Sequence, residues 1–158
     1  MAVLSARNDL KLRSKIKSDC APLNALVQRM LGASNDIHVL RDPTRGGLAT
    51  ALNEISSSSG CGIMIDESKI LVNTAVRNIC NLLGFDPLYV ANEGKLVGFV
   101  GAGSERKILG AMKKDKYGKE SRIIGKVVGS PKGVWLKTIS GGMRPLIMLE
   151  GDQLPRIC

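Results

Sequence analysis

The stretch RDPTRGGLATALNEIS, from Arg41 to Ser56, gives the clearest indication of how this chain folds. Gly46 and Gly47 permit a tight turn, because glycine adopts backbone conformations that other residues avoid. After them, apolar residues recur at the spacing of one helical face, which predicts a helix from about Gly47 to Ser57. Thr44 is a candidate N-cap for this helix. The apolar residues expected to face inward are Leu48, Leu52 and Ile55.

On both sides of this helix, the same criteria predict further helices and strands. One helix lies between Leu23 and Leu31, one between the candidate N-cap Asn73 and Gly84, and a weaker one opens at Ser104. Short apolar runs are typical of strands. They are AVLSA at 2–6, IHVL at 37–40, CGIMI at 61–65, KLVGFVG at 95–101, SRIIGKVV at 121–128 and GVWLKTI at 133–139.

The order of these elements predicts an α+β fold, in which helices are layered on a mixed, mostly antiparallel sheet. Helices and strands alternate in the first part of the chain, whereas strands cluster toward its end. The last two strands are joined by GSPK at 129–132, whose composition predicts a hairpin turn. We expect one domain over residues 1–150, followed by a flexible C-terminal tail at 151–158.

Length and charge narrow the classes of function. A chain of 158 residues can bury one sizeable core but not two ordinary ones. The net charge is +9, but the basic residues are dispersed, so we expect no nucleic-acid partner. No apolar run approaches the ~20 residues of a membrane span, and no signal-peptide pattern opens the sequence. We therefore expect no membrane partner and a cytoplasmic location.

The cysteines do not indicate a metal site or a disulfide. They stand at positions 20, 61, 80 and 158, too far apart for a local redox pair, and the chain has one histidine. Cys61 and Cys80 fall in apolar contexts and are expected to be small buried hydrophobes. Cys158 is the last residue and is expected to be the only cysteine outside the fold, so its thiol can carry a chemical group. An extended tail would let it reach roughly 25 Å from Gly151, at ~3.3 Å per residue.

The turn before the Gly47 helix is a candidate anion site. The backbone N–H groups of Gly46 and Gly47 are uncovered at a helix start, where the helix dipole favours a phosphate or a carboxylate. The alternative is a structural turn, in which Asp42 and Arg45 pair with each other or hold the loop, and the spacing favours neither. No Gly-x-x-x-x-Gly-Lys-Ser/Thr loop occurs, so a nucleotide site of that kind is not indicated.

A second candidate is Glu93, within DPLYVANEGKLV from Asp86 to Val97. It lies in a turn between two apolar runs and beside Lys95, and an ionised glutamate so placed can accept a proton from a substrate. Its neighbours Asn92 and Gly94 would let the turn approach a bound segment closely. The alternative is a solvated turn residue.

Four stretches together resemble the C-terminal half of the HypE family of hydrogenase maturation proteins: SDCAPLN, RDPTRGGLATALNEIS, DPLYVANEGKLV and the closing LPRIC. The RDPTRGG stretch is shared more loosely with the aminoimidazole ribonucleotide synthetase superfamily, which includes selenophosphate synthetase. A terminal LPRIC is specific to HypE. The superfamily's C-terminal domains have helices layered on a mostly antiparallel sheet, which agrees with the order of elements above.

The resemblance implies a function for the terminal thiol. In HypE, the carbamoyltransferase HypF loads a carboxamide onto the terminal cysteine, which here is Cys158. HypE then uses ATP with Mg to dehydrate the carboxamide to a thiocyanate, and the cyano group passes to iron held by HypC and HypD. Glu93 would serve as the base. The residues implied in binding substrate or phosphate are Asp42, Arg45, Gly46, Gly47 and Asn92.

The resemblance also implies that an N-terminal half is absent here, the half that supplies most of the ATP site and the homodimer contact in HypE. We therefore expect this chain to be inactive by itself. Two alternatives remain. One is a selenophosphate synthetase-like, ATP-dependent enzyme acting on another amide or on selenide. The other is a non-catalytic docking module whose tail binds a partner, and Cys158→Ser would leave its function intact.

Overall fold

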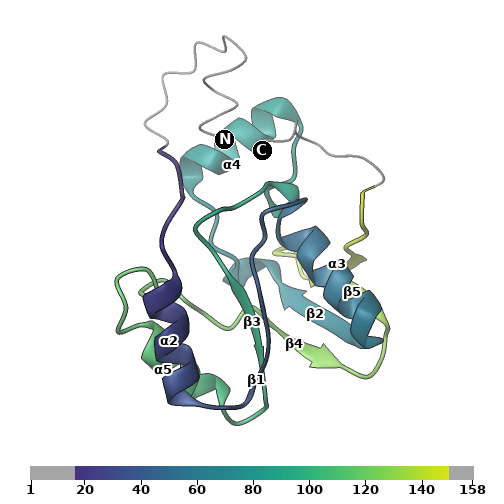
Figure 1. Ribbon diagram of the computed structural model, residues 1–158. Coiled ribbons are helices and arrows are strands. Elements are labelled where there is room, and N and C mark those ends of the chain that lie inside the picture. The colour runs from purple at the N-terminus through teal and green to yellow at the C-terminus, as the bar shows by residue number, and fades with distance from the viewer. Residues whose placement is uncertain (1–16, 150–158) are drawn as a thin grey trace.

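The computed structural model describes residues 17–149, so the strand predicted at 2–6 and the tail at 151–158 lie outside the described residues. Within them, no helix is long and apolar enough to cross a membrane. The helices are α2 (Asn24–Ala33), α3 (Gly47–Ser59), α4 (Thr74–Leu83) and α5 (Glu105–Met112), with the short 3-10 helices η1 (Glu67–Lys69) and η2 (Pro87–Tyr89). The strands are β1 (Ile37–Arg41), β2 (Gly62–Asp66), β3 (Val97–Val100), β4 (Gly125–Val128), β5 (Gly133–Lys137) and β6 (Met143–Pro145), as Figure 1 shows.

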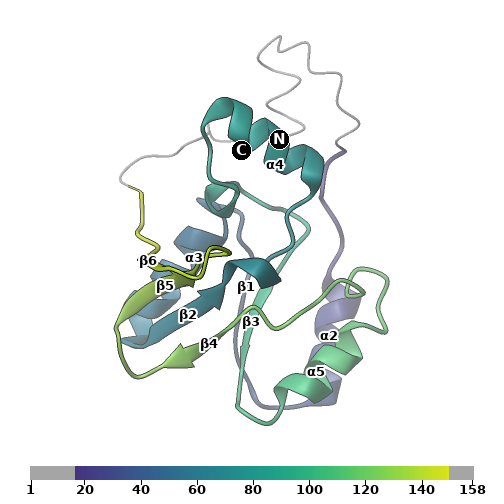
Figure 2. The ribbon, with the colours of Figure 1, turned by 180° about the vertical axis from the view of Figure 1, so that it is seen from behind.

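The main core lies between α3 and a four-stranded sheet of order β4-β2-β5-β6. Strands β2 and β5 are parallel neighbours, with Ile63 opposite Val134 and Ile65 opposite Leu136. Alternate residues of a strand point to the same face, so these four side chains share one face of the sheet. All four are buried, because α3 lies against that face (Figure 2).

A second, smaller core lies between the helices α2 and α5 and a two-stranded sheet. Strands β1 and β3 pair antiparallel in this sheet. The two helices lie side by side (Figure 1), and they bury Leu26 and Met30 of α2 together with Ile108 of α5. Its buried residues form a separate cluster from those under α3, although Val97 and Phe99 of β3 pack against the main core.

The four predicted helices are confirmed, and so are both predicted ends of α4. The side-chain oxygen of Asn73 accepts a hydrogen bond from the backbone N–H of Ala75 at 2.9 Å, which caps the helix at its N-terminus. Gly84 ends the helix in the left-handed conformation, with φ of 72°. The N-cap predicted at Thr44 is wrong, because the cap residue of α3 is Gly46, two residues later.

The hairpin predicted at GSPK is also wrong, because the two strands that it joins are not neighbours. β2 lies between them, antiparallel to β4 and parallel to β5. The connection therefore crosses the end of β2. There the Lys132 ammonium donates a hydrogen bond to the carbonyl of Gly60, and a side chain at Gly62 would collide with the carbonyl oxygen of Pro131.

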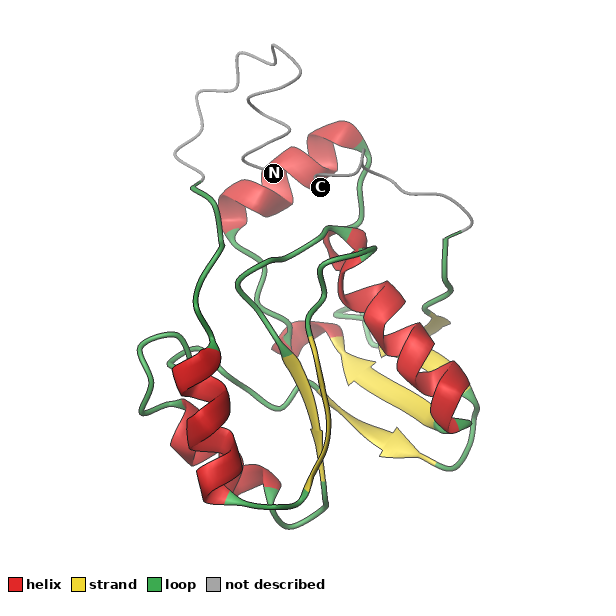
Figure 3. Cartoon of the chain, in the orientation of Figure 1, coloured by secondary structure: helices red, strands yellow, loops and turns green. Residues whose placement is uncertain are grey.

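The predicted fold class is confirmed. Three of the four strand pairings are antiparallel and one is parallel, and helices are layered on the sheets (Figure 3). No pattern in the sequence predicted β6, whose three residues pair with β5 at the edge of the sheet.

Candidate functional site

The start of α3 is the turn that the sequence singled out as a candidate anion site, and Gly47 in it is buried. Gly46 and Gly47 both adopt the left-handed conformation, with φ of 59° and 64°. None of the described side chains caps the helix, and its first turn has no acidic residue. The first backbone N–H groups of a helix have no partner within the helix and carry its positive dipole end. This geometry fits an anion such as a phosphate or a carboxylate.

The loop that carries Asn92 packs directly against this helix start. The backbone N–H of Asn92 donates to the carbonyl oxygen of Pro43 at 3.0 Å. Gly47 is buried against the backbone of Leu88 and Val90, with no room for a side chain between them. Pro43 and Asn92 are 49 residues apart in sequence, and the fold brings their loops together.

In the RDPTRGG loop, Asp42 does not pair with Arg45, the pairing that the structural-turn alternative included. Arg41, rather than Arg45, lies within 3.8 Å of the Asp42 carboxylate, and it makes a shorter ion pair of 2.7 Å with Glu54. The Thr44 hydroxyl donates to Asp42 at 3.4 Å. Asp42 is therefore held by its own loop, while Arg45, the residue before Gly46, is exposed.

Glu93 is exposed at the tip of the neighbouring turn. The Lys95 ammonium does not pair with Glu93. It donates a hydrogen bond to the side-chain oxygen of Asn92 at 3.0 Å and lies 3.8 Å from the Asp19 carboxylate. Among the described residues, no hydrogen bond or ion pair engages the Glu93 carboxylate. Within residues 17–149, the Glu93 carboxylate therefore has no polar partner.

One side of Gly94 is covered by the backbone of the same chain, at Asp19. A side chain at Gly94 would collide with the carbonyl oxygen of Asp19, so that side of the glycine is not open to another segment. The expectation that Asn92 and Gly94 let the turn approach a bound segment closely stays a prediction for the remaining sides of the turn. The contact between Asp19 and Gly94 places a third stretch, SDCAPLN at 18–24, beside the Glu93 turn.

The described cysteines differ in exposure. Cys80 is completely buried in α4, and this burial raises the pKa of its thiol, as expected of a structural cysteine. Cys61 is half-buried just before β2, less enclosed than predicted. Cys20 is exposed beside the Glu93 turn, although Cys158 was expected to be the only cysteine outside the fold. Cys158 lies outside the described residues.

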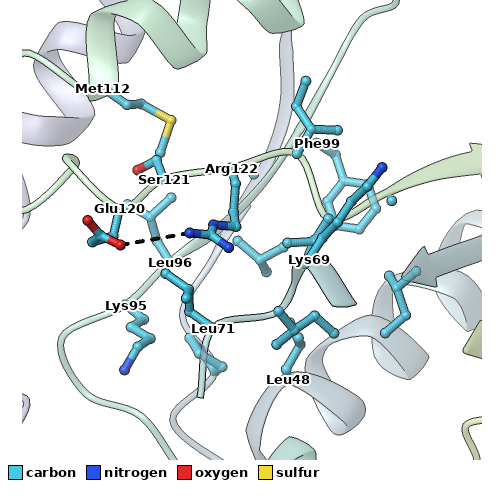
Figure 4. A pocket seen from close by; sticks show the side chains of 18 of the residues that line it. Leu48, Lys69, Leu71, Lys95, Leu96, Phe99, Met112, Glu120, Ser121 and Arg122 are labelled. Carbon is cyan, nitrogen blue, oxygen red and sulfur yellow. Dashed lines mark ion pairs between the residues drawn. The ribbon is translucent and has the colours of Figure 1, made fainter. Parts of the chain in front are cut away.

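A cavity of about 830 Å³ borders the site, and no pattern in the sequence predicted it. It lies between the two cores, so residues from both sheets line it. Figure 4 shows its mainly apolar wall, with Leu48, Leu71 and Phe99, and the ion pair of Arg122 with Glu120 at one side. Pro43 and Asn92 line the cavity where it meets the loops of the site, whereas Glu93 does not line it.

Gly47→Ala is expected to lower the free energy of unfolding by roughly 3 kcal/mol or more. The left-handed backbone costs a non-glycine residue about 1–2 kcal/mol. In addition, the new methyl would lie 2.5 Å from the Leu88 carbonyl oxygen and 2.7 Å from that of Val90. Overpacking of this kind typically costs about 1–3 kcal/mol. Urea denaturation measures the change.

Gly60→Ala is the matched control for that prediction. Gly60 has nearly the same φ, 65°, but a methyl there would meet nothing within 4 Å. It should lose only the backbone cost of about 1–2 kcal/mol. Equal losses in the two variants would contradict a tight contact between the helix start and the 88–90 loop.

Comparison with known proteins identifies the class to which this fold and site belong. The family model described as AIR synthase related protein, C-terminal domain, matches residues 1–136, and the chain belongs to this family. Within the family, the resemblance to HypE is confirmed. The chain is 50% identical to carbamoyl dehydratase HypE of Cupriavidus necator and 45% identical to that of Rhodobacter capsulatus, over 100% and 99% of its length.

Solved structures show the same similarity. A HypE structure in complex with ATP matches 99% of this chain with a TM-score of 0.91 and 42% identity. A HypE–HypF complex matches 90% of it with a TM-score of 0.85 and 46% identity. The chain covers 45% and 46% of the two curated relatives, and 48% and 47% of the two solved chains. It therefore spans about half the length of the proteins that it matches.

Proposed function

We propose that this chain is the C-terminal part of a carbamoyl dehydratase that makes the cyanide ligands of [NiFe] hydrogenase, and that Cys158 carries the reacting group. One observation supports this proposal most. The fold joins the uncapped start of α3 to the turn that presents Glu93, through the hydrogen bond from Asn92 to Pro43. A site with an anion-binding end and an available carboxylate suits phosphoryl transfer followed by removal of a proton. The relatives named carbamoyl dehydratase add support.

The proposed reaction has two steps on the terminal thiol. HypF supplies a carboxamide, which forms a thioester-like carbamoyl group on the Cys158 sulfur. ATP then phosphorylates the carboxamide oxygen and leaves as ADP. One nitrogen proton is lost as the oxygen is phosphorylated. The carbon–oxygen bond then breaks as phosphate departs, the second nitrogen proton is removed, and the product is a thiocyanate on the same sulfur. No electrons are gained or lost, so the reaction needs no redox partner.

The described residues have distinct parts in this proposal. The backbone N–H groups at Gly46 and Gly47 would hold the phosphate, and the exposed Arg45 guanidinium would add positive charge beside it. Asn92 would orient the substrate from the adjoining loop, and Asp42 would hold its loop in shape through Arg41 and Thr44. Glu93 would accept the nitrogen proton. ATP is the substrate that provides the driving force, and its Mg²⁺ takes most of its ligands from phosphate and water.

The partners belong to the same proposal. A HypE–HypF complex exists among the similar structures, and we extend HypF to this chain as the donor of the carboxamide. The HypC–HypD complex would receive the cyano group, and the full-length protein would act as a homodimer in the cytoplasm. The domain limits, with a body at 1–150 and a carrier tail at 151–158, remain predictions.

The test of this function is a single-turnover assay on the protein extended to the full length of its relatives. With HypF, carbamoyl phosphate and ATP, mass spectrometry should show first a carboxamide and then a thiocyanate on the last peptide. A carboxamide that persists in the presence of ATP would overturn the dehydratase assignment. Absence of any modification would favour the docking module.

By itself, the chain of 158 residues is expected to bind ATP weakly, with a dissociation constant above the micromolar range. The start of α3 offers one wall for phosphate, and a single helix terminus contributes only about 0.3–1 kcal/mol to the binding of a negative charge at an exposed position. Isothermal titration calorimetry checks this. Micromolar binding would show that the described loops form a more complete nucleotide site than their contacts indicate.

A further inference from the structure

The Lys95 side chain contacts both its own turn and a distant part of the chain. Its ammonium donates a hydrogen bond to the side-chain oxygen of Asn92 at 3.0 Å, and it lies 3.8 Å from the Asp19 carboxylate. Lys95 and Asn92 both line the cavity that borders the site. An ammonium group has three donors and no acceptor. Lys95 can therefore bind only the oxygen of the Asn92 side chain and not its nitrogen.

The nitrogen of the Asn92 side chain has an acceptor as its partner. It donates a hydrogen bond to the carbonyl oxygen of Val90 at 2.7 Å. An asparagine amide accepts through its oxygen and donates through its nitrogen, and a half-turn of the group exchanges the two. The turned amide would place its nitrogen against the Lys95 ammonium and its oxygen against the Val90 carbonyl oxygen, and both contacts would be repulsive. Lys95 and Val90 therefore select the same orientation of Asn92.

This orientation matters because Val90 and Asn92 form the contact with the start of α3. The Val90 carbonyl oxygen packs on Gly47, where it would lie 2.7 Å from an added Cβ. The backbone N–H of Asn92 donates to the carbonyl oxygen of Pro43 at 3.0 Å. Asn92 thus connects its turn to the helix start through its side chain and through its backbone. Glu93 is the next residue, so its position depends on these contacts.

The ion pair with Asp19 does not by itself explain why Lys95 is held. The side chains of Lys95 and Asp19 are 54% and 42% exposed, and exposed ion pairs contribute little. The shorter contact is the one with Asn92, and a hydrogen bond from a charged donor is stronger than one between neutral groups. The hydrogen bond to Asn92 is therefore the contact of Lys95 that is expected to matter for the turn.

We propose that Lys95 is a positioning residue, which acts through Asn92 to hold the Glu93 turn against the start of α3. In the selected orientation, the Asn92 nitrogen uses one N–H for Val90, and within residues 17–149 its second N–H has no partner. This donor is the group that Asn92 would present to an oxygen of the substrate. The catalytic meaning of the inference rests on the proposed function, whereas the contacts of Lys95 do not.

Amide exchange of the backbone N–H of residue 92, measured by NMR on the chain itself, tests the inference without any ligand. Lys95→Met keeps the aliphatic stem and removes the donor. It should make this N–H exchange about fivefold faster, the factor that corresponds to ~1 kcal/mol for one hydrogen bond. Lys95→Arg keeps a donor and should exchange at nearly the parent rate. Unchanged exchange in Lys95→Met, or equally fast exchange in both variants, would overturn the inference.

Lys132→Met is the matched control for this measurement. The Lys132 ammonium also donates a hydrogen bond to its own chain, to the carbonyl of Gly60 at the other end of α3. The substitution removes the same charge and the same kind of donor at a place outside the cavity lining. Exchange at residue 92 should remain at the parent rate. A rate raised as much as in Lys95→Met would show a general effect of lost charge and would overturn the inference.

A double-mutant cycle tests whether Lys95 acts through Asn92. In an Asn92→Ala background, the Lys95 ammonium has lost its acceptor on the turn, so adding Lys95→Met should not make the N–H of residue 92 exchange any faster. A fivefold increase in both backgrounds would mean that Lys95 holds the turn by another route, which overturns the inference. If Asn92→Ala fails to fold, Lys95→Met and Lys95→Arg, which change only an exposed side chain, decide the result alone.

The same cycle in the full-length protein measures the catalytic meaning. Lys95→Met should slow thiocyanate formation about fivefold in single turnover, with loading of the carboxamide unchanged, and it should add nothing to the effect of Asn92→Ala. Additive losses would assign Lys95 a direct contact with the substrate and overturn the positioning role. If the parent protein forms no thiocyanate, the dehydratase assignment fails, and the exchange rates still decide this inference. If the parent is active and Lys95→Met is equally active, the positioning role fails, and the assignment stands.

Discussion

Cys158→Ala is expected to abolish loading of the carboxamide by HypF, to the level of the reaction without acceptor. The group must be attached to a nucleophilic thiol that a partner protein can reach. Cys80 is completely buried with a raised pKa, and Cys61 is half-buried at the start of β2. Neither meets that requirement. Peptide mass mapping after reaction with HypF and carbamoyl phosphate identifies the modified residue.

Cys20 provides the sharpest control for this prediction, because it is the exposed thiol that the sequence did not single out. The chain around it is fixed to the domain: the Asp19 carboxylate lies 3.8 Å from Lys95, and the Asp19 carbonyl packs on Gly94. A thiol held in this way is poorly suited to meet several partners in turn. Cys20→Ala should load as the parent does. A carboxamide found on Cys20, or on the Cys158→Ala protein, would refute the carrier role.

Glu93→Gln in the full-length protein is expected to slow thiocyanate formation at least tenfold, while loading of Cys158 remains at the parent level. A positioned base contributes roughly 10²–10⁴-fold to a proton transfer, and glutamine keeps the shape of the side chain without its basicity. Loading happens first and does not need this base. Single-turnover kinetics, started with carbamoylated protein and ATP, separates the two steps.

The control for this second prediction is Glu120→Gln, another exposed glutamate, which lines the cavity and pairs with Arg122. It should form thiocyanate at the parent rate. If Glu93→Gln also reacts at the parent rate, Glu93 is a solvated turn residue, the alternative that its sequence context left open. If both variants are equally slow, the effect arises from lost charge and not from a base.

Part of the candidate site was predictable because its signals are local. Two adjacent glycines before an apolar helical repeat predicted a tight turn at the start of α3, and both glycines are left-handed. The partners of the charged side chains were not predictable in this way. Asp42 contacts Arg41 rather than Arg45, since the direction of each side chain depends on how the strand enters the turn.

The sequence by itself determined the positions of α2, α3, α4 and α5 and the ends of α4, because periodicity and capping depend on residues within about one turn of each other. Through the resemblance to HypE, it also predicted a carrier role for Cys158, which stays a prediction. Only the tertiary structure decided that β2 lies between β4 and β5, that Asn92 reaches Pro43, and that Lys95 reaches Asp19. These contacts join segments that are distant in the chain. Which of them form depends on how the apolar faces of all the elements are buried together, and no short stretch of sequence contains that information.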